Sequence, residues 1–348
     1  MRTLRSLTPI VLAMLLAPLP LTPGARADDK TLYVGSYGGS YETIMKQQVI
    51  PPFEKTAGVQ VQYVSGNSSE TLAKIQAQKG HEDLDVAVLD DGPMYQAKSL
   101  GLCGKLKTGP NYADIYDLAK MGDDAVATGV VATGLAYDAR AFEKAGWPAP
   151  TSWADLADKK YAGKIAIPGI DNTYGLVALL MYARQNGGGI DNIDPGFAYM
   201  AKTIAPNVRA FESSPGRMSE LFQSGEVSLA IWGSGRVNAL ADTGFPIKFV
   251  YPKEGAAALL ITACVVNGAP HDATAQAFVD YLLSPSVQAL LANAGNGPVN
   301  KKVTLSPELA ARLPYGPEQI SKLVAFDWSK VNPKRDDWTK RWNREIER

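Results

Sequence analysis

Strand-like and helix-like segments alternate along most of the chain, and this alternation limits the possible folds more than any other feature. The apolar run Leu32–Val34 meets a glycine-rich stretch, and a helical pattern follows. A second strand-like segment (60–66), a helix that begins after Asn67 and an apolar strand that ends at Asp90 complete a βαβαβ pattern. Such a pattern predicts a parallel sheet with right-handed crossovers, and hence an α/β fold.

Later segments continue this pattern. Pro51 and Pro52 are expected to break the first helix, because proline lacks a backbone N–H. Residues 129–142 predict a long apolar strand, and residues 150–169 predict a Ser/Thr-capped helix followed by a strand. Three tryptophans of the charged tail are expected to anchor a terminal helix: Trp328, Trp338 and Trp342.

The first residues have the features of a secretory signal peptide. Arg2 and Arg5 precede an apolar run, and Ala25–Ala27 gives the small-residue cleavage pattern. The apolar run is short for a membrane span, prolines interrupt it, and no cysteine follows the cleavage site. Residues 1–27 are therefore predicted to be removed, and the mature chain is expected to be exported without a lipid anchor.

Length and charge narrow the class of protein further. The full chain has 348 residues with 35 basic and 35 acidic side chains. Removal of residues 1–27 takes away three arginines and no acid, which leaves a net charge of −3. Nothing in this balance suggests a nucleic-acid surface. A mature chain of this size is too long for a single hydrophobic core, so two domains are expected.

The sequence contains two cysteines, Cys103 and Cys264. In an exported protein they can form one disulfide. Each also lies in an apolar stretch, where a buried free thiol is common. Both alternatives remain open from the sequence.

The sequence offers little for catalysis, metal or cofactor binding. Its two histidines, His81 and His271, lie in loop contexts that are usually solvated surface. The G-x-S-x-G pattern is absent at Gly233–Gly235, and no H-E-x-x-H, C-x-x-C or Walker motif occurs. We therefore predict no metal, no cofactor and no enzymatic activity.

Polar and aromatic residues follow several of the predicted strands. In open α/β sheets the carboxyl ends of strands line the ligand crevice, helix N-termini add N–H donors, and glycines let the backbone approach a ligand. Asp90, Asp171 and Ser234 can alternatively be helix caps, and the tyrosines can be surface residues. The predicted ligand-binding residues are Ser36, Tyr37, Tyr41, Asp90, Asp91, Asp171, Asn172, Thr173, Tyr174, Trp232, Ser234 and Arg236. Trp232 is expected to form an apolar or cation-facing wall, and Asp90 or Asp91 to meet a positive group.

Four segments resemble the periplasmic solute-binding proteins of ABC importers, in particular the spermidine/putrescine-binding branch: "PTSWADLADKKYAGKIAI", "FQSGEVSLAIWGSGRV", "FVYPKEGA" and "AFVDYLLSPSVQALLANAG". The resemblance implies a type II periplasmic-binding-protein fold with a ligand cleft between two lobes and a hinge of crossing strands. It places lobe 1 at 28–132 and 260–300, and lobe 2 at 133–259 and 301–348. It also implies a small-molecule ligand, an inner-membrane permease with its ATPase as partners, a monomer and a periplasmic location.

The sequence departs from the polyamine binders of this family. Those proteins carry a carboxylate in the strand after the "PKEG" turn, whereas no acidic residue lies between Glu254 and Asp272 here. The loop at 170–175 offers one acid rather than a pair. These departures favour a ligand with one cationic end, with Arg236 and helix N-termini available for an anionic end. A true polyamine binder, an exported enzyme on the same fold and a protein that presents ligand to a chemoreceptor remain alternatives.

Overall fold

The computed structural model describes residues 30–347, so the predicted signal peptide lies outside the described residues. Within these residues, nine strands form one sheet in the order β2-β1-β3-β9-β4-β7-β5-β6, and β8 pairs with β4. Their bounds are β1 Thr31–Tyr37, β2 Gln60–Gly66, β3 Val86–Asp90, β4 Val126–Asp138, β5 Ile165–Ile167, β6 Val208–Phe211, β7 Leu229–Gly233, β8 Ile247–Val250 and β9 Ala257–Val265.

Fifteen α-helices pack around this sheet in the described part of the chain. They are α1 Ser40–Ile44, α2 Ile50–Ala57, α3 Ser68–Ala77, α4 Asp91–Ser99, α5 Ala139–Ala145, α6 Thr173–Gln185, α7 Asp194–Tyr199, α8 Pro215–Gln223, α9 Ser234–Ala241, α10 Asp272–Leu282, α11 Pro285–Ala292, α12 Pro307–Ala311, α13 Gly316–Ser321, α14 Trp328–Val331 and α15 Arg335–Glu345. Within residues 30–347, none of the helices has the length and apolar character that a membrane crossing requires.

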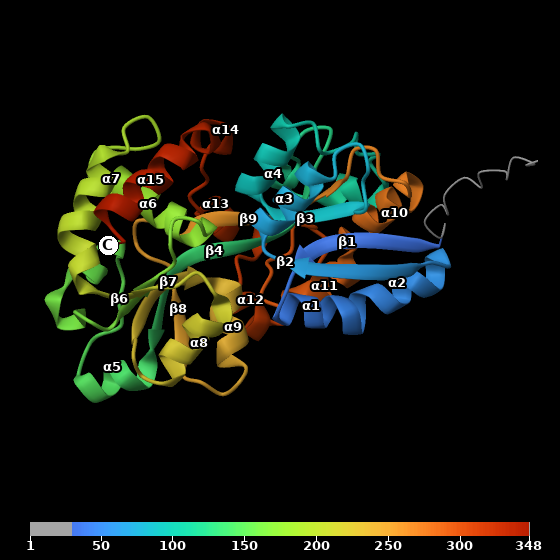
Figure 1. Cartoon of the computed structure of the whole chain (residues 1–348). Coiled ribbons are helices and arrows are strands. Elements are labelled where there is room, and N and C mark those ends of the chain that lie inside the picture. Colours follow the sequence, from blue (N-terminus) through green and yellow to red (C-terminus); the bar gives the residue numbers. More distant parts are fainter. Residues whose placement is uncertain (1–29, 348) are drawn as a thin grey trace, which may run out of the picture.

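The elements divide into two lobes joined by two long strands. Figure 1 shows β1–β3 with α1–α4, α10 and α11 in one body, and α5–α9 with α14 and α15 in the other. The parallel pairing of β1 with β2 and with β3 confirms the predicted βαβαβ arrangement. Strand β4 pairs with β9 from Val126 to Thr133 and then with β7 from Thr133 to Tyr137. The two lobes therefore meet where β4 changes its partner, and the chain has the two-lobed α/β fold that the sequence predicts.

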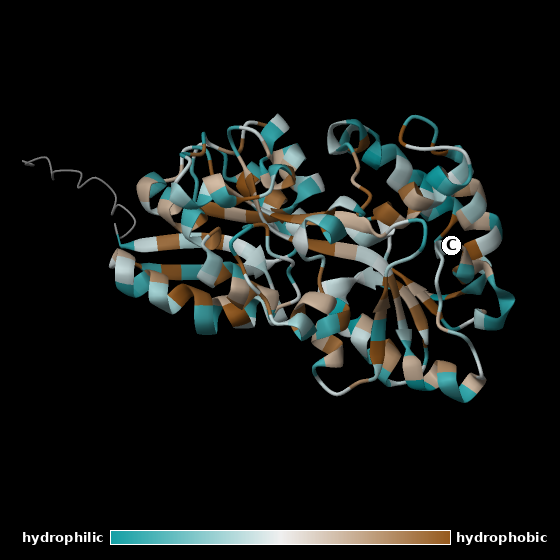
Figure 2. Ribbon diagram, turned by 180° about the vertical axis from the view of Figure 1, so that it is seen from behind, coloured by the Kyte–Doolittle hydropathy of each residue, from teal (hydrophilic) through white to brown (hydrophobic). Residues whose placement is uncertain are grey.

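Each lobe has a hydrophobic core of its own. One core draws its buried side chains from residues 32–131 and 259–320. The second lobe has a large core from 135–257 and 328–346, and a smaller one around Phe222 and Trp232. Figure 2 shows hydrophobic residues concentrated along the central strands and hydrophilic residues on the outer helices. We call the first body the N-terminal lobe and the other the second lobe. Ile320, which the predicted boundaries assign to lobe 2, packs in the N-terminal lobe. The residue boundaries of the two lobes stay a prediction.

Two predictions about helices are wrong. Pro51 and Pro52 do not break the first helix, because α1 continues through a π-helical segment, Met45–Val49, into α2. Both prolines stand in the first turn of α2, where a missing N–H costs little. The helix expected within 150–169 is instead two short 3₁₀ segments, Trp153–Ala157 and Lys159–Tyr161, before β5.

The sequence left open whether the two cysteines form a disulfide, and the structure shows that they do. Cys103 and Cys264 form a disulfide across a sequence separation of 161. The backbone N–H of Gly104 donates to the carbonyl of Val265 at 2.8 Å, which holds the segment after α4 beside the end of β9. The bond therefore fixes the last strand of the N-terminal lobe to its first half.

The structure also shows where the C-terminal tryptophans and His271 lie. Trp328, Trp338 and Trp342 are buried in the second lobe, which confirms them as anchors of the C-terminal helices. His271 is not the solvated loop residue that the sequence suggests, because its side chain is only 7% exposed. Its Nδ1 lies 3.0 Å from Oδ1 of the fully buried Asp85.

Candidate ligand-binding site

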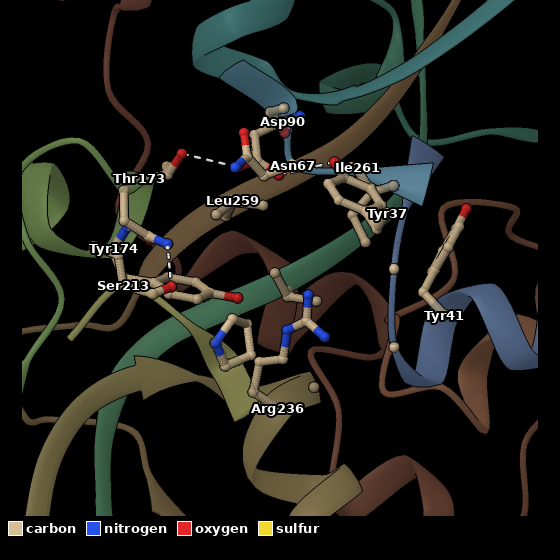
Figure 3. Close-up of a pocket in the computed structure, with 18 of the residues that line it drawn as sticks. Tyr37, Tyr41, Asn67, Asp90, Thr173, Tyr174, Ser213, Arg236, Leu259 and Ile261 are labelled. Atoms are coloured by element: carbon tan, nitrogen blue, oxygen red, sulfur yellow. Dashed lines mark hydrogen bonds between the residues drawn. The ribbon is translucent and has the colours of Figure 1, made fainter. Parts of the chain in front are cut away.

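A cavity of about 720 Å³ lies between the two lobes, which is within the usual range for small-molecule sites. Its floor includes Val131 of β4 and Leu259 and Ile261 of β9. Loops of the N-terminal lobe form one wall, and the loops that open α6, α8 and α9 form the other. The strands that join the lobes therefore also form the base of the cavity, and Figure 3 shows side chains of both lobes around it.

The structure brings most of the predicted site residues to this cavity. The predicted residues that line it are Tyr37, Tyr41, Asp90, Asp171, Asn172, Thr173, Tyr174 and Arg236. They converge because β1, β3, β5 and β7 each end at the cavity and are followed by a loop or a helix start. This is the arrangement expected at the carboxyl ends of strands in an α/β sheet.

Asp90 stands at the end of β3 and faces the cavity. It occupies the position before α4, yet its side chain does not cap that helix. Oδ1 instead accepts a hydrogen bond from Tyr37 Oη at 2.8 Å, and Oδ2 accepts one from Thr173 Oγ1 at 2.8 Å. The alternative interpretation of Asp90 as a helix cap is therefore wrong.

The environment of Asp90 shifts its titration. Burial among protein atoms raises the pKa of the Asp90 carboxyl, because low-polarity surroundings disfavour the charged form. The hydrogen bonds from Tyr37 and Thr173 and the positive charge of Arg236 oppose that rise. Burial likewise raises the pKa of Tyr174 to about 12. Burial also raises the pKa of Tyr37 well above its usual value, so Tyr37 and Tyr174 both offer neutral hydroxyls to the cavity.

The N-terminus of α9 forms a region of opposite character. Arg236 lies in the first turn of α9 and lines the cavity, and no side chain in the described part of the chain caps this helix. Asn296 lies in the adjoining loop, since a Cβ on Gly235 would lie 3.1 Å from the carbonyl oxygen of Gly295. Asn296 lines the cavity, and its amide nitrogen is buried and has no hydrogen-bond partner within residues 30–347. Backbone and side-chain donors thus gather here beside a positive charge.

Asp90 and Arg236 bring opposite charges to the cavity. Across residues 30–347, the ion pairs include neither Asp90 nor Arg236. Arg236 Nη1 lies near Gly39, where an added Cβ would be 3.5 Å away. Besides Asp171, whose Oδ1 already accepts a hydrogen bond from Ser213, the cavity presents the Asp90 carboxylate and the Arg236 guanidinium, each available to pair with a group of opposite charge.

Local geometry explains the shape of the second-lobe wall. Asn172 caps α6, with its Oδ1 accepting from the N–H of Tyr174 at 2.9 Å. The Tyr174 ring lies directly over Gly233, where an added Cβ would be 2.2 Å from Tyr174 Oη. Only glycine fits at that position, so the end of β7 and the start of α6 are shaped to each other. Asp171 is no helix cap; it accepts a hydrogen bond from Ser213 Oγ at 2.9 Å.

Four predicted residues do not line the cavity. Trp232 is 2% exposed and stacks on Phe222 in the core of the second lobe, with ring centroids 6.1 Å apart. Ser234 is fully buried, and its Oγ accepts a hydrogen bond from the N–H of Ala132 on β4. Ser36 is buried because it lies next to Tyr37 in β1, where neighbouring side chains point to opposite faces, and Asp91 is buried at the start of α4. The prediction that Trp232 forms a wall of the cleft is therefore wrong.

Asp91 points away from the cavity to the contact between lobes. It interacts by hydrogen bonds with the Trp328 side chain and with backbone groups of Leu260 and Gly92. Burial raises the pKa of its carboxyl to about 7. Asp91 therefore belongs to the junction between α4, β9 and α14 rather than to the ligand-facing wall.

Sequence reasoning missed several residues of the cavity: Ser65, Asn67, Ser68, Ser69, Ser213, Ser214 and Asn296. The capping box at Asn67 and Glu70 was a usable signal, because it fixes the start of α3 at the end of β2. Asn296 carries no comparable local signal. Its loop reaches the cavity only because α10 and α11 return the chain to the N-terminal lobe.

Fold and cavity together define a two-lobed binding protein, and comparison with known proteins places it in a family. The sequence pattern of the bacterial extracellular solute-binding proteins matches residues 48–314. The chain belongs to this family, and its role is that of the substrate-binding component of an ABC transporter.

The individual relatives share low sequence identity with this chain. The chain is 25% identical to a γ-aminobutyric acid-binding protein of Pseudomonas aeruginosa, over 89% of each chain. It is 26% identical to a periplasmic protein of Salmonella typhimurium named for binding 2-aminoethylphosphonate, over 74% of each chain. It is also 26% identical to the spermidine/putrescine-binding periplasmic protein of Escherichia coli, over 84% of this chain and 82% of that protein.

Solved structures agree with the fold. The crystal structure of an ABC transporter protein from Clostridium perfringens shares 28% identity and a TM-score of 0.75, covering 90% of this chain and 99% of that one. An extracellular solute-binding protein of Bordetella parapertussis shares 26% identity and a TM-score of 0.74, covering 91% and 99%.

Proposed function

We propose that this protein captures a small zwitterion, with an amine directed to Asp90 and an anionic group directed to Arg236. The observation that carries the proposal is the pair of opposite charges on one cavity, neither of which is engaged in an ion pair within the described chain. A ligand with a single charge would leave one of these groups without a partner in a partly desolvated site, which is unfavourable.

The amine end is supported by the surroundings of Asp90. Tyr37 and Tyr41 pack edge to face with ring centroids 5.3 Å apart, and both line the cavity beside this carboxylate. An ammonium can pair with Asp90 while its methylene groups contact the rings. Relatives named for binding γ-aminobutyric acid, 2-aminoethylphosphonate and polyamines support an amine-containing ligand.

The anionic end is supported by the N-terminus of α9. The guanidinium of Arg236, the amide of Asn296 and the first N–H groups of α9 are donors suited to a carboxylate or a phosphonate. A polyamine would bring no negative group to these donors. We therefore favour an ω-amino acid or an aminophosphonate over putrescine and spermidine.

Binding is proposed to close the lobes and to present the complex to an inner-membrane permease with its ATPase. The strands near 132–134 and 258–260 are the proposed hinge, because β4 changes its pairing partner at Thr133. We propose a periplasmic monomer that carries ligand and performs no catalytic step.

The proposal is tested by thermal unfolding with four compounds: γ-aminobutyrate, 2-aminoethylphosphonate, putrescine and butyrate. A compound that binds only the folded chain raises the melting temperature. At least one of the two zwitterions should raise it more than putrescine and butyrate do. Asp90→Asn should remove this preference, whereas Lys340→Gln, a change on the exposed face of α15, should keep it. A stronger response to putrescine than to either zwitterion would contradict the proposal.

A further inference from the structure

Asp90 connects the two lobes across the cavity. Tyr37, which donates to Oδ1, belongs to β1 of the N-terminal lobe. Thr173, which donates to Oδ2, is the first residue of α6 in the second lobe. A single carboxylate therefore receives one hydroxyl donor from each side of the cavity.

Local structure does not require these hydrogen bonds. Asn172 caps α6, so the Thr173 hydroxyl is not needed there. The backbone N–H of Asp90 is satisfied by Ser68 Oγ at 3.0 Å, and α4 has its own start without the Asp90 side chain. Thr173 is nevertheless 7% exposed, so its hydroxyl is held in place rather than rotating freely in solvent. Its one side-chain hydrogen bond in the described chain is the contact between lobes.

The charge on Asp90 sets the strength of this contact. A hydroxyl donating to an ionised carboxylate forms a shorter and stronger hydrogen bond than one donating to a neutral group. Burial favours the neutral form of Asp90, and a cation beside it favours the ionised form. Each carboxylate oxygen keeps a further lone pair, so an ammonium can bind while Tyr37 and Thr173 stay bonded. An amine at Asp90 thus strengthens the hydrogen bond that holds the lobes together.

We propose that Asp90 and Thr173 form a clasp that couples recognition of the ligand's amine to lobe closure. Thr173 is a positioning residue that acts through Asp90. This inference rests on the proposed function, because it takes an amine in the cavity as given. By linkage, an amine that strengthens the clasp is bound more tightly by the same factor when the clasp is intact. A ligand without the amine gains nothing from it.

The test measures whether the amine and the Thr173 hydroxyl depend on each other. Titration calorimetry compares γ-aminobutyrate with butyrate, and 2-aminoethylphosphonate with ethylphosphonate, on the wild-type chain and on Thr173→Val. Loss of the hydroxyl should weaken the amine-bearing member of the pair about tenfold and its partner by less than about twofold. Thr56→Val is the matched control, because Thr56 Oγ1 also donates a hydrogen bond, to the carbonyl of Pro52, on an exposed face of α2.

A second measurement needs no ligand. The clasp is a hydrogen bond between the lobes and contains no ligand atom, so Thr173→Val should increase the radius of gyration in small-angle scattering, whereas Thr56→Val should not. Equal weakening of amine-bearing and amine-free compounds, or no weakening, would overturn the clasp. An unchanged radius in Thr173→Val would overturn it as well. If the wild-type chain binds neither zwitterion, the proposed function fails, and the scattering result then decides on the contact between lobes alone.

Discussion

Replacement of Trp232 by alanine distinguishes a core residue from a cavity wall. Trp232 is 2% exposed, its ring stacks on the fully buried Phe222 at an interplanar angle of 18°, and its backbone pairs with Gly134 of β4. Removing a buried tryptophan ring costs about 3–5 kcal/mol, since the cavity left behind is only partly refilled. In a folding unit of about 150–250 residues, each kcal/mol lowers the melting temperature by about 2–4 °C. Trp232→Ala should therefore melt about 6–20 °C lower than the wild-type chain.

Scanning calorimetry measures this shift, and titration with the best zwitterion at a temperature where the variant is folded measures affinity. Affinity should change by less than about threefold, because Trp232 does not line the cavity. Trp232→Phe is the graded control, which keeps a ring against Phe222 and should lose less stability. A melting temperature within about 2 °C of wild type together with a more than tenfold loss of affinity would refute the core placement.

Three further predictions concern charge, covalent linkage and pH. Arg236→Gln should weaken the zwitterion about ten- to hundredfold by calorimetry, with the melting temperature unchanged, because a charged hydrogen bond to the ligand is lost; an unaltered affinity would exclude Arg236 as the anion contact. Cys103→Ala with Cys264→Ala should lower the free energy of unfolding by up to about 5 kcal/mol in urea, the chain-entropy value for a loop of this separation; reductant should do the same to the wild-type chain, and matching curves for all three samples would contradict the prediction. Burial raises the pKa of Asp91 to about 7, so the folded chain holds this proton more tightly than the unfolded chain, and stability from this group falls by about 1.4 kcal/mol per unit as pH rises from 5 to 7. Urea unfolding of Asp91→Asn should show a shallower fall than wild type over that range, and parallel slopes would refute the assignment.

The periodicity of the sequence was sufficient for most of the strands, but β6 was not predicted and β4 spans Val126–Asp138 rather than residues 129–142. Residues at or just after the ends of β1, β3 and β5 reached the cavity as predicted, with the exception of Asp91, because parallel strands place their carboxyl ends at one edge. For β7, the sequence did not indicate which side chains point toward the cavity and which point into the core. All five of its residues are buried, so alternation gives no sign of which side faces the ligand, and the aromatic ring of Trp232 was assigned to the wrong side.

Contacts between distant segments were also beyond the sequence. Asp90 and Asp91 are adjacent and chemically identical, yet one faces the cavity and the other faces Trp328, which lies far along the chain. The register of β9 beside the segment after α4 decides that Cys103 meets Cys264, and no local pattern encodes it. Asn296 became part of the site through the return of the chain to its first lobe.

The position of β9 in the sheet has a consequence for how the chain folds. Strand β3 pairs with β9 through contacts such as Asp90 with Ile261, and β4 pairs with it through Val126 with Ala263. During synthesis from the N-terminus, β3 and the first half of β4 therefore lack their common neighbour until residues 135–256 of the second lobe have been made. Contacts this far apart in sequence slow folding, and an unpaired strand edge invites association with other chains. The N-terminal lobe is thus begun first but lacks its central strand until most of the second lobe has been made, and chaperone dependence should be concentrated on the interval before β9 appears.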